Sequence, residues 1–217
     1  MSTKVEENAT FRELFLSHGT TYDYRKGEFI IRPGEAPSGI FYIESGLVKA
    51  YDITKYGEEN VLIVRRKDEV FPLIWAVTGQ ERKVIYEALV PTVVRLVRRD
   101  VFLDFIHNNP DALSVLLDMA IEMYRIHSER ILNMGYRNAR ERLVSFLLTT
   151  AGRFGVQQPN GDILIDAPLR QQDIGSSISA SRETVGREIQ VLERKGLLSS
   201  YDGYITIHDS GKLQDFL

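Results

Sequence analysis

The segment Ser181-Arg182-Glu183-Thr184-Val185-Gly186-Arg187-Glu188-Ile189-Gln190-Val191-Leu192-Glu193-Arg194-Lys195-Gly196 is the most informative stretch of the chain. Its apolar side chains Val185, Ile189 and Leu192 recur at helical spacing and form one narrow stripe. Long polar side chains occupy the opposite face, namely Glu183, Arg187, Gln190 and Arg194. Ser181 fits an N-cap and Gly196 fits a helix end. The segment is therefore predicted to be a helix with one buried and one polar face.

A shorter helix is predicted just upstream, over residues 171–178, with Ile174 and Ile178 facing inward. Only Ser179-Ala180 separates the two helices. Two short helices joined by a tight turn are typical of a helix-turn-helix. A solvated amphipathic helix would carry a similar charge pattern. The Arg and Glu side chains gathered at the helix start favour a recognition helix that meets base edges.

Composition sets limits on the class of protein. The 217 residues are 43% hydrophobic and 26% charged, as in ordinary globular proteins. The absence of cysteine excludes disulfides, zinc fingers and thiolate-held iron–sulfur clusters. No apolar run approaches the roughly twenty residues of a membrane span, and residues 1–7 contain no apolar signal core. We therefore expect a cytoplasmic protein without a membrane partner.

The first half of the chain is rich in short β-forming runs punctuated by glycine and proline. After an initial helix with Phe11, Leu14 and Phe15 on one side, strands are predicted at residues 29–31, 40–43, 47–51, 61–64, 83–89 and 93–97. Residues 55–58 are predicted to form a hairpin turn. Many short strands at this spacing indicate an antiparallel barrel or jelly roll. Residues 71–82, which contain Pro72 and Gly79, are predicted to be a short helix or loop set into the barrel wall, where a ligand could bind.

A long helix is predicted from Pro110, capped by Asn109 or Asp111 and broken at Gly135. Its apolar side chains recur at a coiled-coil-like spacing. The predicted seam consists of Leu113, Leu116, Leu117, Ala120, Met123, His127, Ile131 and Met134. These side chains could pack on the barrel, but the length of the helix favours a parallel homodimer.

Another amphipathic helix is predicted over residues 139–154, followed by a strand at 163–165. After the helix-turn-helix, residues 197–198 and 204–207 flank Asp202-Gly203, a dipeptide typical of tight hairpins. The predicted fold class is α+β, with four parts: an antiparallel β-barrel (jelly roll) at 1–109 that senses an effector, a dimerisation helix at 110–134, a hinge at 135–138, and a winged helix-turn-helix at 139–217 that binds DNA.

This order of elements resembles the cAMP receptor protein/fumarate-nitrate reductase regulator (CRP/FNR) family of bacterial transcription factors. The most specific match is residues 181–187, which are similar to the family's recognition-helix motif. Residues 29–34, residues 42–48 and Asn109-Pro110-Asp111 add further matches. The barrel is then expected to resemble a cyclic-nucleotide-binding domain.

The resemblance implies roles for individual residues. Arg182 and Arg187 match the arginines that read guanines, and Glu183 matches the carboxylate that accepts from a cytosine amino group. Ser181, Thr184, Gln172 and Gln190 are further DNA-contact candidates, the first three for phosphate groups. Two such helices would bind a TGTGA-like palindrome about 34 Å apart. RNA polymerase is an expected further partner.

The effector pocket departs from the family pattern. Pro72 stands where cyclic-nucleotide binders carry the ribose-binding Glu, and it offers neither a carboxylate nor an N–H. Arg82 matches the phosphate-binding arginine, but Lys83 replaces its hydroxyl partner. The other candidate pocket residues are Phe71, Trp75, Tyr124, His127 and Ser128. Cyclic AMP or cyclic GMP is therefore disfavoured, and Arg82 could equally be a surface ion-pair residue.

Other effectors remain open. Haem is disfavoured because His18, His107, His127 and His208 are scattered, and no metal site is expected. Phe71, Trp75 and their neighbours suit an apolar or aromatic effector, or a self-packed insert with no ligand, in which Trp75 fills the core.

The leading hypothesis is a homodimeric, sequence-specific transcription regulator controlled by an unidentified effector. The alternative is a ligand-binding or protein-docking module whose winged helix no longer reads DNA. An enzyme is not expected, because no catalytic constellation is present in the sequence.

Overall fold

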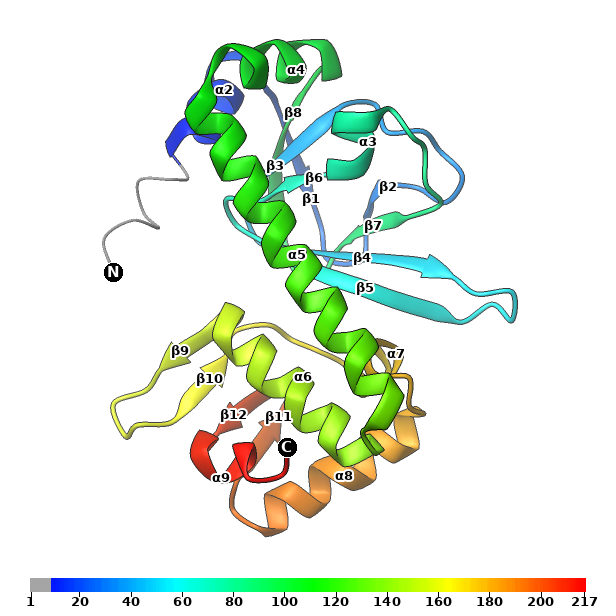
Figure 1. Ribbon diagram of the computed structural model, residues 1–217, viewed down its shortest axis with the longest axis vertical. Helices are drawn as coiled ribbons and strands as arrows, with labels where there is room; N and C mark the ends of the chain where they lie inside the picture. The colour runs from blue at the N-terminus through cyan, green and yellow to red at the C-terminus, as the bar shows by residue number, and fades with distance from the viewer. Residues whose placement is uncertain (1–8) are drawn as a thin grey trace. The chain divides into compact units, whose positions relative to one another are not determined.

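The computed structural model describes residues 9–217, which form two compact units (Figure 1). Among the described residues, the N-terminal unit comprises 9–53 together with Leu62–Met123, and the C-terminal unit comprises Thr54–Val61 and Tyr124–Leu217. Strand β5 (Glu59–Arg66) and helix α5 (Pro110–Tyr136) each run from one unit into the other. The expectation about residues 1–7 lies outside the described residues. None of the described helices is long and apolar enough to cross a membrane.

Two antiparallel four-stranded sheets form the body of the N-terminal unit, with strand orders β1-β8-β3-β6 and β2-β7-β4-β5. Besides β5, their strands are β1 (Thr20–Tyr24), β2 (Phe29–Ile31), β3 (Ile40–Ser45), β4 (Leu47–Ile53), β6 (Val70–Phe71), β7 (Ile85–Ala88) and β8 (Thr92–Val97). The predicted jelly roll is therefore confirmed. Strands β1 and β6 were not predicted, because β1 is largely exposed and without aliphatic residues and β6 is very short.

Three helices accompany these sheets: α2 (Ala9–His18), α3 (Leu73–Thr78) and α4 (Arg99–Asn108). Phe11 and Phe15 of α2 are fully buried, and Phe15 stacks on Tyr42 of β3 with ring centroids 5.3 Å apart. Helix α3 is the predicted insert. Helix α4, in which Phe102 and Ile106 are buried, was not predicted.

Helix α5 begins where Asn109 Oδ1 accepts a hydrogen bond from the Ala112 N–H at 3.3 Å, which confirms the predicted Asn109 cap. Helix α5 passes through Gly135 and ends one residue later, at Tyr136, within the segment 135–138 where the break was predicted. Glycine lowers helix stability by about 1 kcal/mol but does not block the helical conformation. The interruption falls at residues 137–138, where the Asn138 side chain and Glu141 form the capping box of the next helix.

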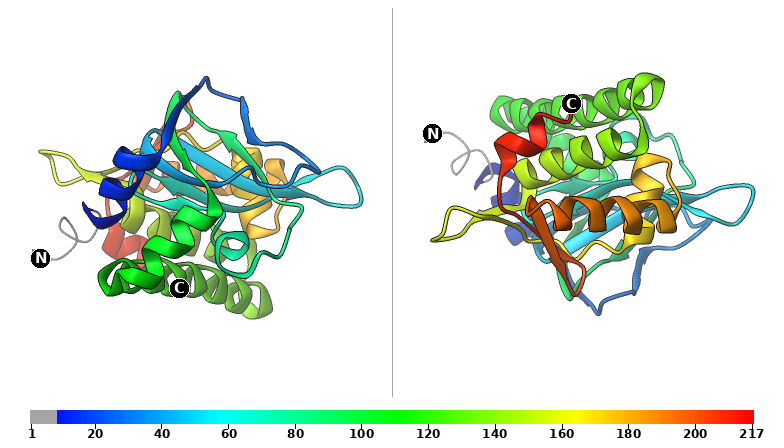
Figure 2. Two further views of the ribbon diagram at one scale, coloured as in Figure 1. Left: turned by 90° about the horizontal axis from the view of Figure 1, so that it is seen from above. Right: turned by 90° about the horizontal axis from the view of Figure 1, so that it is seen from below.

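The C-terminal unit is a winged helix. It contains α6 (Ala139–Phe154), β9 (Gly155–Gln157), β10 (Ile163–Ile165), α7 (Gln171–Ile178), α8 (Arg182–Arg194), β11 (Leu198–Tyr201), β12 (Tyr204–Ile207) and α9 (Ser210–Gln214). Its sheet has the order β11-β12-β10-β9. Asp202 and Gly203 both have positive φ, at 49° and 82°, as the predicted tight hairpin requires. Figure 2 (right) shows α8, in orange, alongside α6, with the β11–β12 wing close by.

The turn between α7 and α8 is tight. A Cβ atom at Gly175 would lie only 2.6 Å from the Ala180 carbonyl oxygen, so this position requires glycine. Ser179 ends α7 in the left-handed conformation, with φ 55° and ψ 53°. A residue with a Cβ adopts this conformation at a cost of about 1–2 kcal/mol.

We expect Ser179→Gly to stabilise the protein by roughly 1 kcal/mol, because glycine adopts the left-handed conformation without the Cβ clash. Ser177→Gly, in the last turn of α7, is the matched control. It should destabilise by about 0.5 kcal/mol, because glycine is a poor helix former. Chemical denaturation of both variants measures the difference. If both substitutions destabilise the protein, strain at Ser179 is not a significant cost.

Candidate functional site

Helix α8 is anchored through its apolar stripe. Val185, Ile189 and Leu192 are at most 3% exposed, as predicted. The predicted polar face is exposed and includes Arg182, Glu183, Arg187, Gln190 and Arg194. Gln172 is also exposed, in the first turn of α7. The structure thus places the predicted DNA-contact side chains on the surface of one unit.

The start of α8 is organised by Ser181. Its Oγ accepts a hydrogen bond from the Thr184 N–H at 3.1 Å and lies 3.1 Å from Thr184 Oγ1. Glu183 lies fully exposed in the first turn. A hydrogen bond from its own backbone N–H, one from the Ser181 hydroxyl and the charge of Arg182 together lower the pKa of the Glu183 carboxyl. Glu183 is therefore an ionised hydrogen-bond acceptor at neutral pH.

Arg142 of α6 binds the backbone where α7 of the helix-turn-helix ends. The sequence did not suggest this role. Its guanidinium donates to the carbonyl oxygens of Ile178 at 2.8 Å and Ser179 at 3.3 Å, where α7 ends. It also donates to the Arg137 carbonyl oxygen at 2.7 Å. One side chain thus donates to carbonyl oxygens at the end of α7 and at the α5–α6 junction.

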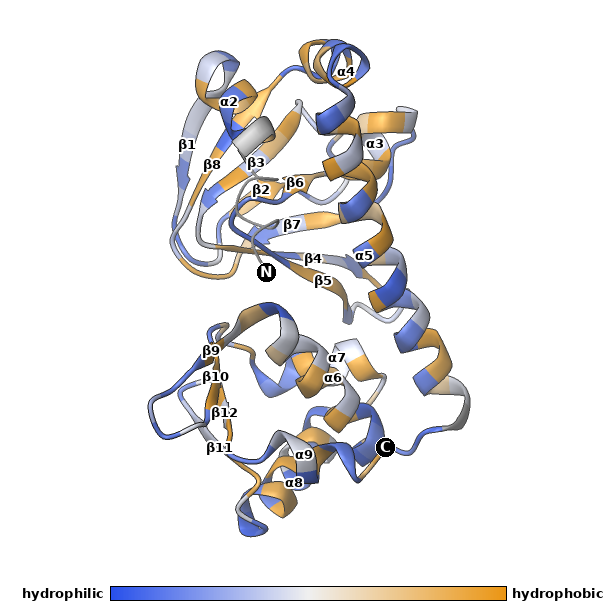
Figure 3. Cartoon of the chain, turned by 60° about the vertical axis from the view of Figure 1, so that its left-hand side comes forward, coloured by the Kyte–Doolittle hydropathy of each residue, from blue (hydrophilic) through white to orange (hydrophobic). Residues whose placement is uncertain are grey.

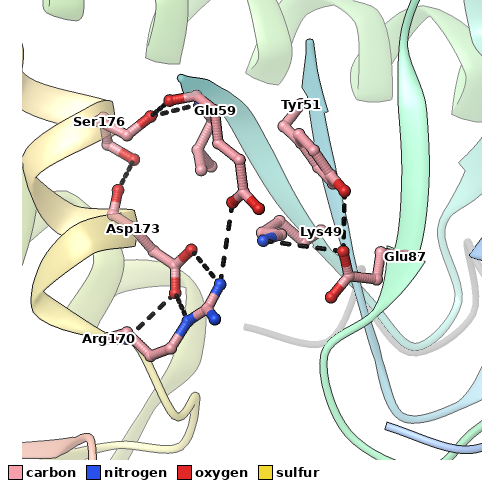
Figure 4. Close-up of polar contacts among 9 residues, drawn as sticks. Lys49, Tyr51, Glu59, Glu87, Arg170, Asp173 and Ser176 are labelled. Atoms are coloured by element: carbon pink, nitrogen blue, oxygen red, sulfur yellow. Dashed lines mark hydrogen bonds and ion pairs between the residues drawn. The ribbon is translucent and has the colours of Figure 1, made fainter. Parts of the chain in front are cut away.

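The turn segment Thr54–Val61 belongs to the C-terminal unit through a set of polar contacts with α7 (Figure 4). Ser176 Oγ donates to the Glu59 carbonyl oxygen at 2.7 Å and accepts from the Val61 N–H at 2.7 Å. Arg130 of α5 donates to the carbonyl oxygens of Val61 and Ser176 at 2.7 and 2.9 Å. No sequence signal marked these contacts, because their partners are up to 117 residues apart.

The predicted effector residues of the N-terminal unit differ in exposure. Phe71 is fully buried and stacks between Phe41 and Tyr86, with ring centroids 5.2 and 4.7 Å away. Burial raises the pKa of the Tyr86 phenol, so its hydroxyl stays protonated. Arg82 and Lys83, in contrast, are exposed.

Trp75 is partly buried, and the Arg99 guanidinium lies 5.8 Å from its ring centroid. The same guanidinium donates to the Trp75 and Ala76 carbonyl oxygens at 3.1 and 3.0 Å, near the end of α3. Tyr124, His127 and Ser128 lie in the C-terminal unit, where Tyr124 is 76% exposed. Within its own unit, the Trp75 insert is thus held by packing and by α4.

A buried ionic group in the second sheet was missed by sequence reasoning. Lys49 is 1% exposed, and its Nζ lies 3.9 Å from Glu87 Oε2 and 4.4 Å from the Tyr51 ring centroid (Figure 4). The Tyr51 hydroxyl donates to the same carboxylate oxygen at 2.9 Å. Lys49 and Glu87 are directly opposite each other on β4 and β7. In the sequence, only the opposite charges of Lys49 and Glu87 could have indicated this contact. They become recognisable as a cross-strand pair once the register of β4 and β7 is known.

Arg65 of β5 is a second buried cation, at 3% exposure. It pairs with Glu69 Oε2 at 3.3 Å and donates to Met123 Sδ at 2.8 Å. Its Nε has no hydrogen-bond partner among the described residues. The described part of the chain contains no cluster of three or more potential metal ligands.

The comparisons with known proteins agree with this architecture. Residues 22–109 match the model of the cyclic nucleotide-binding domain, and residues 141–216 match the Crp-like helix-turn-helix domain. The chain is 31% identical to a global nitrogen regulator of Synechocystis over 192 residues, which cover 87% of this chain and 84% of that protein. The chain belongs to the CRP/FNR family.

Two further relatives support the CRP/FNR assignment. The cAMP-activated global transcriptional regulator CRP of Salmonella typhimurium is 28% identical over 198 residues, covering 90% of this chain and 93% of that protein. The structure of FixK2 from Bradyrhizobium japonicum is 25% identical with a TM-score of 0.76, covering 91% and 96% of the two chains. This CRP/FNR protein is a transcription regulator with a helix-turn-helix DNA-binding domain, and the curated relatives are regulators rather than enzymes.

In this CRP/FNR protein we expect Glu87→Gln to destabilise the fold by about 3 kcal/mol, because it removes the carboxylate that faces a buried ammonium group. The double variant Lys49→Met/Glu87→Gln should be more stable than Glu87→Gln alone, because the buried charge is then gone. Urea unfolding of the wild type, both single variants and the double variant measures the coupling. Simple additivity of the two changes would contradict the pairing.

Proposed function

We propose that this regulator is a homodimer that reads a TGTGA-like palindrome through α8. The observation that carries the proposal is the exposed face of α8. Its apolar stripe is buried, so Arg182, Glu183 and Arg187 project from the surface on the first two turns. Recognition helices use these turns in the major groove.

The side-chain chemistry supports guanine and cytosine as the bases that are read. A guanidinium can fork onto guanine O6 and N7, and an ionised carboxylate can accept from the cytosine amino group. The lowered pKa of Glu183 keeps it in that accepting form. Ser181, Thr184 and Gln172 are assigned to phosphate groups, which position the helix without specifying sequence.

The second copy is proposed to pack along α5. This helix exposes several large apolar side chains at helical spacing, namely Leu113 (54%), Leu117 (58%), Ile121 (56%), Tyr124 (76%) and Ile131 (65%). Figure 3 shows orange segments along α5. Two predicted seam residues lie elsewhere: Leu116 is buried in the core of its own unit, and Met123 packs against that core. The proposed seam therefore runs through Leu113, Leu117 and Ile121.

The net charge of the protein favours a second copy of the chain as the partner that covers the exposed face of α5. The net charge is −3, so one exposed face of α8 attracts phosphate groups only weakly. Two recognition helices held in one dimer bind one palindrome together, which raises the effective affinity. The recurrence of exposed apolar side chains along α5 also fits coiled-coil pairing.

The effector is proposed to be something other than a cyclic nucleotide. Pro72 is buried and offers no N–H, and Lys83 is exposed where the family's nucleotide binders carry a hydroxyl. An effector would act by favouring one arrangement of the helices that meet at residues 137–138. The regulator is proposed to work together with RNA polymerase.

We expect Arg182→Ala to lower the preference for a TGTGA palindrome over a scrambled site by roughly tenfold to a hundredfold, because one bidentate base contact is lost. Arg194→Ala removes the same charge from the far end of α8 and is the matched control. It should weaken binding to both sites equally. Gel-shift titrations at several salt concentrations measure both effects.

Each outcome of these titrations has a separate meaning. Weak binding without salt dependence or sequence preference would favour a winged helix that docks a protein instead of DNA. Equal losses for Arg182→Ala and Arg194→Ala would contradict base readout by Arg182. Tight specific binding by untreated protein would exclude an effector switch and leave DNA recognition in place.

We expect Ile121→Glu to convert the dimer into a monomer, because two carboxylates would be buried in the seam. Ile53→Glu is the matched control, since Ile53 is similarly exposed (49%) but lies on β4. Sedimentation equilibrium measures the mass of each variant. A mass of one chain for the wild type, or an unchanged dimer for Ile121→Glu, would contradict the α5 seam.

A further inference from the structure

Glu188 is a charged residue of α8 that is buried and therefore makes none of the proposed base contacts. It follows Arg187 directly, yet it is only 8% exposed. Its Oε2 accepts a hydrogen bond from Arg140 Nε at 2.7 Å, and its Oε1 lies 3.4 Å from Arg187 Nε. A single buried carboxylate therefore joins α6 to the exposed arginine of α8.

A carboxylate at this position calls for a reason beyond packing. Glu188 lies among the inward-facing residues Val185, Ile189 and Leu192, which are all apolar. Replacing a buried ion pair by apolar side chains is often neutral or stabilising. The charge is therefore better explained by what the carboxylate holds than by the stability that it contributes.

The contact with Arg187 restricts the guanidinium in a useful way. Glu188 engages the Nε, which leaves the two terminal Nη groups as the remaining donors. These two groups form the fork that can bind guanine O6 and N7 end-on. The Arg187 side chain is 67% exposed, so this fork is open to solvent and to a ligand.

We propose that Glu188 is a positioning residue for base readout: it holds Arg187 by its Nε and presents the terminal fork to a guanine. This inference rests on the proposed function, in which Arg187 reads a base. A preorganised arginine loses less side-chain entropy on binding than a free one. Glu188 thus sets the strength of one base contact without touching DNA.

Arg140 completes the arrangement. Its guanidinium compensates the Glu188 charge, so that the carboxylate does not repel the phosphate groups of DNA. Arg140 is in the first turn of α6, two residues after the Asn138 cap. Arg187 is therefore linked through Glu188 to Arg140, which lies in the first turn of α6 next to the α5–α6 junction.

The test is the pattern of base preference, measured with full-length Glu188→Gln. Binding is titrated on palindromes in which each base pair of the half-site is changed in turn. The Arg187 base pair is defined as the one whose preference is lost in Arg187→Ala, and the Arg182 base pair is defined in the same way. We expect Glu188→Gln to lower the preference at the Arg187 base pair by about two- to tenfold. The preference at the Arg182 base pair should stay unchanged.

Two further variants separate positioning from general stability. In the Arg187→Ala background, Glu188→Gln should cause no additional loss of preference, because there is no arginine left to hold. Glu193→Gln is the matched control on the same helix. Glu193 accepts from the Ser200 N–H and hydroxyl at 2.9 and 2.6 Å and does not engage Arg187. It should lower neither preference selectively.

The alternative outcomes are distinct. If Arg187→Ala abolishes a preference and Glu188→Gln leaves it intact, the positioning role is wrong and base readout by Arg187 stands. Equal losses at the Arg187 and Arg182 base pairs would mean that Glu188 only stabilises the unit, which also overturns the inference. If Arg187→Ala alters no preference, base readout by Arg187 fails and the positioning role fails with it.

Discussion

The burial of one apolar stripe of α8 determines what the winged helix can present. Because Val185, Ile189 and Leu192 face the interior, the helix can rotate very little without exposing them, and each exposed side chain has a defined direction. The exposed face follows from this constraint, including Arg182 and Arg187. A loss of packing at the stripe would affect every base contact together. Selective effects on one base must therefore come from residues that act on a single side chain.

Helix ends supply the second level of organisation. Asn138 caps α6, Ser181 caps α8, and Arg142 binds the carbonyls where α7 ends. These contacts lie at the ends of α6, α7 and α8, where backbone groups have no partner within the helix. They are polar and directional, and each contributes only about 1 kcal/mol. Helix ends fixed in this way have a defined geometry, although each single contact contributes little to the stability of the unit.

The sequence predicted the features that depend on local periodicity and turn chemistry. The α8 stripe, the Asn109 cap and the Asp202-Gly203 hairpin all follow from neighbouring residues. Features that depend on distant partners were missed. Strand β1 is recognisable through its pairing with β8. Glu188 is buried against Arg140, which is 48 residues away in the sequence. The break after α5 was placed within one residue of its position, because glycine marks helix ends only as a preference.

In the N-terminal unit, too, the strand pattern was predictable from the sequence, whereas contacts between distant side chains were not. The fold of a cyclic nucleotide-binding domain is kept, since it depends on strand pattern and aromatic packing. The interior nevertheless carries Lys49 paired with Glu87, and Phe71 is enclosed by Phe41 and Tyr86. These side chains occupy space and satisfy charge within the protein itself. One fold can carry different binding sites, so the ligand of such a unit depends on individual side chains and not on the strand pattern.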